Sequence, residues 1–430
     1  MELDRRTFLA GAAGLSLAGS ALSAGSTEAA AEQSGRRLKI AALTPVYHKY
    51  SHSQHIVDRF LEGYGWDGSH HRPEMDIVSL YVEQVGDGDL SRDRAARHPG
   101  MKIYPTIAEA LTLGGEKLAV DGVLLIGEHG EYPKNEKGQT LYPRYEYFQQ
   151  VVDVYRRSGR TAPLFNDKHL SWNWDWAREM YDTAREMGFG LMAGSSLPVG
   201  RRIPAVDLPW GTEIEEVVGV WNNSPDGGDI HLLEAMQCLV ERRRGGESGV
   251  QSVHALRGDA FWTALRSGSW DAGGWDARLF KACLCRADVL MPAWETYNHV
   301  FPTSDELQRM APTAYAYRFE YRDGLKATVM MLPDGVGDCT VAIRQRDGNV
   351  LSTLFHLPYF AVRNFFNPQV HHIETFFRTG QSPYPVERTL LTTGMTAAGL
   401  ESAFQGHRRL ETPHLAIAYE APKASTFWSN

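Results

Sequence analysis

Four groups of side chains capable of acid–base chemistry follow or lie within short apolar stretches of the sequence. They are Tyr47, His48 and His52; Glu128, His129, Glu131 and Tyr132; Lys168 and His169; and His231 and Glu234. Imidazole, carboxylate, ammonium and phenol groups can transfer protons to a substrate or stabilise charge that develops on it. Together these residues predict a site for proton transfer or for binding a polar small molecule.

Lys168 is the strongest single candidate, because an ammonium group can orient a hydroxyl, protonate a leaving oxygen or neutralise an enolate. Glu128 is a candidate general acid or base, since partial burial can raise the pKa of a carboxyl group. The predicted catalytic set is Lys168, His169, Glu128, His129, His231 and Glu234. A surface lysine at a helix start and a solvated loop are the alternative interpretations of this set.

The predicted substrate-binding residues are polar or aromatic side chains of the same stretches and one tryptophan. They are Tyr47, His48, His52, Glu131, Tyr132 and Trp172. Trp172 stands close to Trp174 and Trp176, and this cluster offers flat faces on which sugar rings can stack. Ordinary core or interface aromatics are the alternative.

A divalent metal is a further possibility at the same place. Imidazoles at His48, His52 and His55 would share one face of a helix, and Glu128 or His129 could complete a ligand set. The predicted ligands are His48, His52 and His129. Because the helix is expected to begin after His48, polar pocket histidines remain the alternative.

The elements that position these residues can be read from hydrophobic periodicity. Short apolar runs alternate with longer periodic stretches over residues 37–200, which predicts βαβ units and a parallel sheet. Ligands of such sheets bind beyond the carboxyl ends of the strands, so the polar groups should converge there. After a Pro-, Arg- and Gly-rich stretch, a helix at 230–243, alternating stretches at 314–321, 326–332 and 339–344 and a terminal helix near 392–405 follow. The predicted fold is α/β: a Rossmann-like parallel-sheet domain at 37–200 and an α+β domain with a mostly antiparallel open sheet at 205–422.

Several stretches resemble the Gfo/Idh/MocA (glucose–fructose oxidoreductase-like) family. Asp167-Lys168-His169, followed by a helix to Gly188 and a short strand at 191–194, resembles the family's Glu-Lys-Pro turn, helix and strand. The stretch from Pro105 to Ala110 and the stretch at 372–385 are also similar to it. The resemblance implies this two-domain fold, sugars or cyclitols as frequent substrates, and pairing of copies through the antiparallel sheet of the second domain.

Three departures from the family pattern bear on the cofactor. The turn at 43–53 lacks the glycines of G-x-G-x-x-G and instead places Tyr47, His48 and His52 where a dinucleotide diphosphate would lie. The Glu-Lys-Pro turn keeps only its lysine. The family's Asp-x-x-x-His falls on Leu233 and Gln237, so His231 and Glu234 are the candidates to replace it. NAD(P) is therefore not expected in its usual pose, and the cofactor stays open.

Three functions remain in view. The leading one is a carbohydrate-active enzyme that acts on a sugar or glycoside by lyase- or hydrolase-type acid–base chemistry, without a conventionally bound nicotinamide. The first alternative is an NAD(P)-dependent sugar oxidoreductase with an atypical cofactor loop. The second is a non-catalytic carbohydrate-binding relic of the fold.

The beginning of the sequence and its charge indicate where the protein acts. Residues 1–34 contain Asp4-Arg5-Arg6-Thr7-Phe8-Leu9 and a run of small apolar residues, which predicts a twin-arginine signal peptide and linker. A periplasmic or secreted protein, with no membrane attachment after cleavage, is expected. The net charge of −8 gives no basic surface for nucleic acid, so a small sugar or glycoside is the expected partner.

Overall fold

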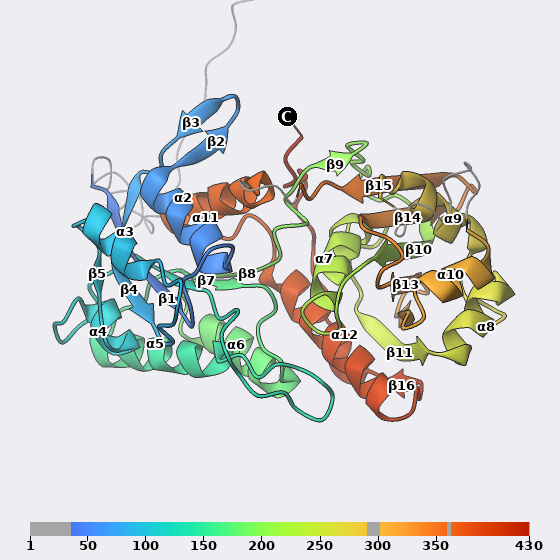
Figure 1. Ribbon diagram of the computed structural model, residues 1–430, viewed down its shortest axis with the longest axis horizontal. Coiled ribbons are helices and arrows are strands. Elements are labelled where there is room, and N and C mark those ends of the chain that lie inside the picture. Colours follow the sequence, from blue (N-terminus) through green and yellow to red (C-terminus); the bar gives the residue numbers. More distant parts are fainter. Residues whose placement is uncertain (1–35, 290–301, 359–362, 430) are drawn as a thin grey trace, which may run out of the picture. The chain divides into compact units, whose positions relative to one another are not determined.

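Two β-sheets organise the chain (Figure 1). The computed structural model describes residues 36–289, 302–358 and 363–429, and Leu38–Asn430 form one compact unit. The predicted signal peptide and linker at 1–34 lie outside the described residues. Within the described ranges, no helix combines the length and the apolar character needed to cross a membrane.

The first sheet has six parallel strands in the order β5-β4-β1-β6-β7-β8. The strands are β1 (Leu38–Thr44), β4 (Met75–Val82), β5 (Lys102–Ile103), β6 (Gly122–Leu125), β7 (Leu164–Asp167) and β8 (Leu191–Gly194). This is the Rossmann order 3-2-1-4-5-6, in which the direction of winding reverses between the first and fourth strands, here β1 and β6. The predicted parallel sheet is confirmed. Strands β6, β7 and β8 are buried along their whole length, as continuous apolar runs in such sheets are.

Helices cover both faces of this sheet. Apolar residues of α4 (Ile107–Thr112), α5 (Arg144–Ser158) and α6 (Trp174–Glu186) pack on one face. On the other face lie α2 (His52–Glu62) and, from far along the chain, α11 (Asn367–Thr379). The short α3 (Ser91–Arg97) precedes β5.

The packing of α11 against the first sheet depends on a small residue in β6. A Cβ atom at Gly122 would lie 3.0 Å from ring atoms of Phe377 and 2.9 Å from Ile40 Cδ1. The glycine therefore lets the aromatic residues of α11 approach the sheet closely.

The second sheet has eight strands in the order β16-β11-β12-β13-β10-β14-β15-β9. They are β9 (Arg202–Ile203), β10 (Ile214–Trp221), β11 (Val250–Arg257), β12 (Tyr315–Tyr321), β13 (Lys326–Met331), β14 (Cys339–Gln345), β15 (Val350–Phe355) and β16 (Leu410–Glu411). The pair β10–β13 is parallel and the other neighbours are antiparallel. The prediction of a mostly antiparallel sheet is confirmed.

Helices also pack on both faces of the second sheet. The helices α7 (Asp229–Val240) and α12 (Val386–Phe404) share a core with one face, and α8 (Asp259–Ser267), α9 (Ala277–Arg286) and α10 (Ser304–Met310) share a core with the other. The terminal helix begins at Val386, before the predicted start near 392. A hairpin of β2 (Tyr64–Trp66) and β3 (Ser69–His71) and two 3-10 turns, η2 (Asn364–Phe366) and η3 (Pro413–Leu415), complete the described elements.

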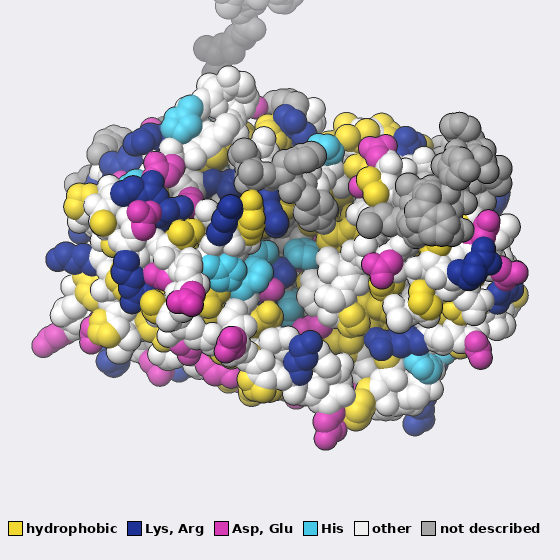
Figure 2. All heavy atoms as spheres, viewed as in Figure 1, with side chains coloured by type: hydrophobic (Ala, Val, Ile, Leu, Met, Phe, Trp, Pro, Cys, Tyr) yellow, Lys and Arg dark blue, Asp and Glu magenta, His cyan; other side chains and the backbone are white. Residues whose placement is uncertain are grey.

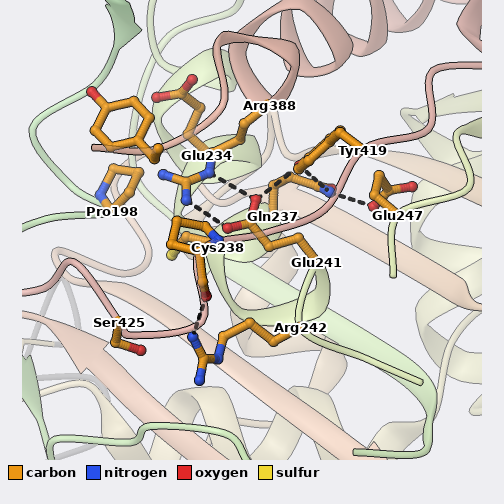
Figure 3. Close-up of polar contacts among 12 residues, drawn as sticks. Pro198, Glu234, Gln237, Cys238, Glu241, Arg242, Glu247, Arg388, Tyr419 and Ser425 are labelled. Carbon is orange, nitrogen blue, oxygen red and sulfur yellow. Dashed lines mark hydrogen bonds and ion pairs between the residues drawn. The ribbon is translucent and has the colours of Figure 1, made fainter. Parts of the chain in front are cut away.

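A buried ionic network joins α7 to α12 (Figure 3). Arg388 donates to Glu241 through Nε at 2.8 Å and Nη2 at 2.5 Å, and Tyr419 donates to Glu241 Oε2 at 2.8 Å. Gln237 donates to the Tyr419 hydroxyl at 3.0 Å and accepts from Tyr321 at 2.7 Å. We call these five residues the α7–α12 network. Buried charges persist in proteins when they are paired in this way.

Candidate functional site

Six of the sequence-predicted polar residues after β1, β6 and β7 lie together at the carboxyl ends of these strands, where the sheet reverses its winding: His48, His52, Glu128, His129, Lys168 and His169. The ring centroid of His129 lies 5.1 Å from that of His52 and 5.8 Å from that of His48. Lys168 Nζ lies 2.8 Å from Glu128 Oε1. Figure 2 shows histidine side chains gathered around a hollow on this face, with charged side chains deeper inside it. We call the site the histidine crevice; it comprises His48, His52, Glu128, His129, Arg144, Asn166, Asp167, Lys168, His169 and His231.

A histidine–aspartate pair stands at the mouth of the crevice. His52 Nδ1 lies 2.6 Å from Asp167 Oδ2, and the two side chains are 14% and 1% exposed. Ser51 caps α2 by accepting from the Gln54 N–H at 3.2 Å, which places His52 in the first turn, facing the end of β7. A buried carboxylate that holds Nδ1 leaves Nε2 as the nitrogen that can exchange a proton. The pair has the arrangement of an oriented general base.

Three charged side chains, those of Glu128, Lys168 and Arg144, lie next to one another in the crevice. Glu128 accepts from Lys168 at 2.8 Å through Oε1 and from the fully buried Arg144 through Oε2. Burial by itself raises the pKa of Glu128, but the charges of Lys168 and Arg144 outweigh burial and hold that pKa well below its usual range. The expectation that burial raises the pKa of Glu128 above its ordinary value is therefore wrong in direction. Glu128 acts as a fixed negative charge that holds Lys168 in the crevice.

Three other imidazoles of the crevice, those of His129, His169 and His231, are held neutral. Burial, with a smaller contribution from the neighbouring His52, lowers the pKa of His129 to about 3. Burial also lowers the pKa of His169 and of His231 well below the usual range. His231 Nδ1 lies 2.5 Å from Ser195 Oγ. A neutral imidazole can both donate and accept a hydrogen bond, which suits the recognition of hydroxyl groups.

Several polar atoms of the crevice have no hydrogen-bond partner among the described residues. They are His129 Nε2, His169 Nδ1 and Nε2, Asn166 Oδ1, and Nε and Nη1 of Arg144. Asp226 Oδ1 lies 3.8 Å from His169 Nε2, too far for a hydrogen bond. Because most buried polar groups in proteins are paired, such a concentration indicates a place where a polar ligand or water completes the bonding.

The backbone of the crevice is strained at two residues. His129 has a φ of 66° and Lys168 a φ of 62°, the left-handed region that non-glycine residues seldom adopt. The Lys168 N–H donates to the Gly194 carbonyl at 3.2 Å, which anchors the strained loop to β8. Strained backbone tends to concentrate at functional sites.

Three predicted substrate-binding residues lie outside the crevice cluster. The Tyr47 hydroxyl is buried and donates to Asp58 of α2 at 2.6 Å, so Tyr47 packs beneath the helix. The Tyr132 hydroxyl donates to Glu83, and Glu131 is exposed. These three residues therefore shape the surroundings of the crevice.

Trp172 and Glu234 also point elsewhere. Trp172 packs edge-to-face on Trp176, with ring centroids 4.8 Å apart, and lines a separate pocket of about 340 Å³. Glu234 accepts from the Ser195 N–H at 2.5 Å and from the Thr389 hydroxyl at 2.6 Å, so its carboxyl group joins β8 to α12. Burial raises the pKa of Glu234 to about 7.

Two residues of the site were absent from the predicted set. Asp167 ends a fully buried strand, and a charged residue in that position was the available signal. Arg144 is the first residue of α5, where a cation interacts unfavourably with the helix dipole. This unfavourable position was the available signal that Arg144 has a role outside the helix.

The predicted metal ligands lie near one another but have other partners. His52 Nδ1 is held by Asp167, and His48 Nδ1 lies 3.0 Å from the Lys49 carbonyl. In the described part of the chain, His48, His52 and His129 do not form a group of three whose ligand nitrogens all lie within 4.8 Å of one another. A metal in the crevice stays a prediction.

The residues after β1 do not fit a dinucleotide in the Rossmann pose. That pose needs free N–H groups at the start of the first helix and a free carboxylate after the second strand. Here the Gln54 N–H donates to Ser51, and the Gln54 side chain accepts from the Tyr50 N–H at 2.6 Å. Glu83, the acidic residue after β4, accepts from Tyr147 at 3.0 Å and from Tyr132. One N–H at the start of α2 and the carboxylate after β4, two of the groups that would bind diphosphate and ribose, are bonded within the protein.

Solved structures share this fold, whereas no family model and no curated protein matches the sequence. GenD2 from gentamicin A biosynthesis, in complex with NAD, is 14% identical with a TM-score of 0.53, over 93% of this chain and 99% of its own. A putative myo-inositol dehydrogenase from Sinorhizobium meliloti 1021 is 12% identical with a TM-score of 0.52, over 87% and 99%. The myo-inositol dehydrogenase from Lactobacillus casei, in complex with NAD(H) and myo-inositol, is 11% identical with a TM-score of 0.51, over 87% and 97%. The chain has the fold of these Gfo/Idh/MocA-type dehydrogenases, which confirms the predicted resemblance at the level of fold.

Proposed function

We propose that the chain is a carbohydrate-active enzyme that works by acid–base chemistry in the histidine crevice, without a conventionally bound nicotinamide. The observation that carries the proposal is the His52–Asp167 pair, oriented at 2.6 Å beside the ammonium of Lys168. The substrate class is a sugar or glycoside, because neutral imidazoles and unpaired polar atoms suit a ligand with many hydroxyl groups.

A lyase reaction uses these groups most directly. With a substrate that carries a carbonyl or carboxylate group, His52 Nε2 takes the proton from the adjacent carbon, and the electron pair moves onto the oxygen. Lys168 stabilises the resulting enolate. The enolate then expels the glycosidic oxygen from the β carbon, and the His52 imidazolium returns the proton to that oxygen. The products are an unsaturated sugar and an alcohol, and no other reactant is consumed.

A second candidate is an NAD(P)-dependent sugar oxidoreductase with an atypical cofactor loop. Two solved structures with the same fold favour it, because their crystals contain NAD or NAD(H). The internal bonding of Ser51, Gln54 and Glu83 opposes it.

The test separates these functions with one panel of substrates. The purified chain is incubated with uronates, keto-sugars and glycosides, first alone and then with NAD⁺ or NADP⁺, while ultraviolet absorbance and reduced cofactor are followed. His52→Gln is compared with His70→Gln, which changes an exposed histidine bonded to the Glu62 carbonyl.

Cofactor-free turnover that is lost in His52→Gln and retained in His70→Gln supports the proposal. Turnover that requires a nicotinamide supports the second candidate. Saturable sugar binding without any turnover contradicts both and leaves a carbohydrate-binding relic.

We also propose that residues 1–34 direct twin-arginine export, so that the enzyme acts in the periplasm or outside the cell. The supporting feature is Arg5-Arg6 before a run of small apolar residues. Replacement of both arginines by lysine should retain the protein in the cytoplasm, as measured by cell fractionation. Unchanged export would contradict this route.

We also propose that copies of the chain associate through the second sheet, because the Gfo/Idh/MocA resemblance implies such pairing. Light scattering of the purified chain should give the mass of a dimer or larger assembly. A monomer at micromolar concentration would argue against it.

A further inference from the structure

A second cluster of ligand-type side chains lies outside the histidine crevice, between the β2–β3 hairpin and α11 (Figure 1). His71 of β3, His371 and Glu374 of α11 present ligand atoms that all lie within 4.8 Å of one another. His71 Nε2 lies 2.7 Å from Glu374 Oε2. We propose that these three residues bind one divalent transition-metal ion of the zinc class, which links the hairpin to α11.

The donor set is the first argument. Two imidazoles and one carboxylate form a ligand set that proteins use for zinc, with a fourth position left to water. His371 and Glu374 are three residues apart, so they share one face of α11. Around a tetrahedral ion with bonds of ~2.0–2.2 Å, ligand atoms lie roughly 3.3–3.6 Å apart. Metal binding would widen the 2.7 Å separation of His71 and Glu374 to this distance and bring the separations to His371, which lie within 4.8 Å, to the same distance.

The burial of Glu374 is the second argument. Its side chain is 1% exposed, and Oε1 has no hydrogen-bond partner among the described residues. Arg378 Nη1 lies 3.9 Å from Oε1, on an exposed side chain. A buried carboxylate with an unpaired oxygen is costly unless a cation compensates it, and a metal ion would do so.

The surroundings hold the ligands in place. The ring of His371 stacks on Trp66, with centroids 4.2 Å apart and planes 15° apart, and Trp66 stacks in turn on Trp428 at 5.1 Å. Asn367 at the start of α11 donates to the Gly65 carbonyl of the hairpin at 2.8 Å. Such outer contacts orient metal ligands and raise affinity.

A structural role follows from the elements involved. A two-stranded hairpin is marginally stable by itself. A metal bound to one hairpin residue and two helix residues would fix β3 against α11, and its binding free energy would add to the stability of the folded chain.

The test uses the full chain after treatment with a chelator. Isothermal titration with ZnCl₂ should show one high-affinity ion per chain, and zinc should raise Tm. In His71→Gln and Glu374→Gln the affinity should fall on the order of tenfold or more. His70→Gln, on the same strand, is the matched control and should bind as the wild type does. Cobalt substitution provides a second readout, because a tetrahedral Co²⁺ site with nitrogen ligands absorbs visible light.

Two outcomes would overturn the proposal. The first is the absence of saturable zinc binding by the wild-type chain. The second is undiminished binding in His71→Gln, with binding lost instead in His52→Gln, which would place the metal in the histidine crevice. His71 is partly exposed, so its substitution should leave the folded chain intact.

Discussion

The histidine crevice and the α7–α12 network both bury charged side chains, but they complete their bonding differently. In the network, Arg388 and Tyr419 donate to Glu241, and Nη1 of Arg388 is the one side-chain nitrogen or oxygen of the five residues without a partner among the described residues. In the crevice, His129, His169 and Arg144 all carry unpaired nitrogens. Burial of charge therefore does not mark a functional site by itself. Unpaired polar atoms on a strained backbone mark it better.

The two regions also differ in what decides protonation. Burial lowers the pKa of Arg388, but Glu241 raises it more, so Arg388 stays charged. Burial governs the pKa of His129, which stays neutral. The network holds a fixed ion pair, whereas the crevice places neutral imidazoles beside the fixed ion pair of Glu128 and Lys168.

The largest effect is expected where the crevice orients its base. Asp167→Asn removes the charge that holds His52 Nδ1, so kcat on a substrate found in the panel above should fall by about 10²–10⁴-fold. Tm should change little, and steady-state kinetics with thermal melts would measure both. A loss of Tm in step with kcat would make Asp167 a structural residue like Glu241.

The next effect should appear in the network. Arg388→Met leaves the Glu241 carboxylate buried without a cation, with the Tyr419 hydroxyl as its remaining donor, and we expect the free energy of unfolding to fall by about 3–5 kcal/mol. Urea denaturation would measure the change. The double variant Arg388→Met/Glu241→Leu should recover most of the loss, and a double variant as unstable as the single one would contradict this explanation.

A pH dependence should separate the crevice imidazole of His129 from the buried carboxyl group of Glu234, which lies outside the crevice. The ordinary pKa of histidine is 6.5, and that of His129 is lowered to about 3. Between pH 3 and pH 6.5, the unfolded chain therefore binds a proton at His129 that the folded chain does not bind. The free energy of unfolding should therefore fall as pH falls below 6.5, by up to ~1.4 kcal/mol per pH unit for this residue.

His129→Gln should flatten this acid slope, as measured by Tm between pH 7 and pH 4. Glu234→Gln is the matched opposite. Because the pKa of Glu234 is raised from 4.5 to about 7, its stabilising contribution is present at low pH and is lost as pH rises through 7. If Tm depended on pH with the same slope in the wild type and in both variants, the opposite pKa shifts of His129 and Glu234 would be contradicted.

The smallest effect is expected at an exposed pair. Arg244 forms an ion pair with Glu213 on the surface, where their side chains are 71% and 37% exposed. Arg244→Ala should change the free energy of unfolding by less than about 1 kcal/mol. A change as large as that of Arg388→Met would mean that pairing, and not burial, sets the energy of these contacts.

The sequence allowed the first sheet and part of the site to be predicted, for local reasons. Short apolar runs and longer amphipathic helices alternate up to β8, and the rule for parallel sheets then brings Lys168 to Glu128. Strand β10 was missed because Glu215 and Glu216 interrupt its apolar pattern, and Glu216 is buried only because Arg344 of β14 pairs with it.

The remaining features depend on contacts between distant residues. His52 and Asp167 are 115 residues apart, and no local sequence pattern predicts that they pair. The position of α11 on the first sheet has the same cause, since its apolar face is compatible with either sheet. The direction of the pKa shift of Glu128 required knowledge of Arg144, which the sequence did not connect to it.

The position of α11 has a consequence for synthesis of the protein. Ile40, Phe165 and Met192 share their core with Val370, Ile373 and Phe376, so the part of this face that α11 covers stays open while the ribosome makes the segment between them. An N-terminal half that cannot close over its own core exposes apolar surface during translation, the condition in which nascent chains need chaperones. Messages truncated before Phe365 should therefore yield aggregated product, although every strand of the first sheet would have been translated.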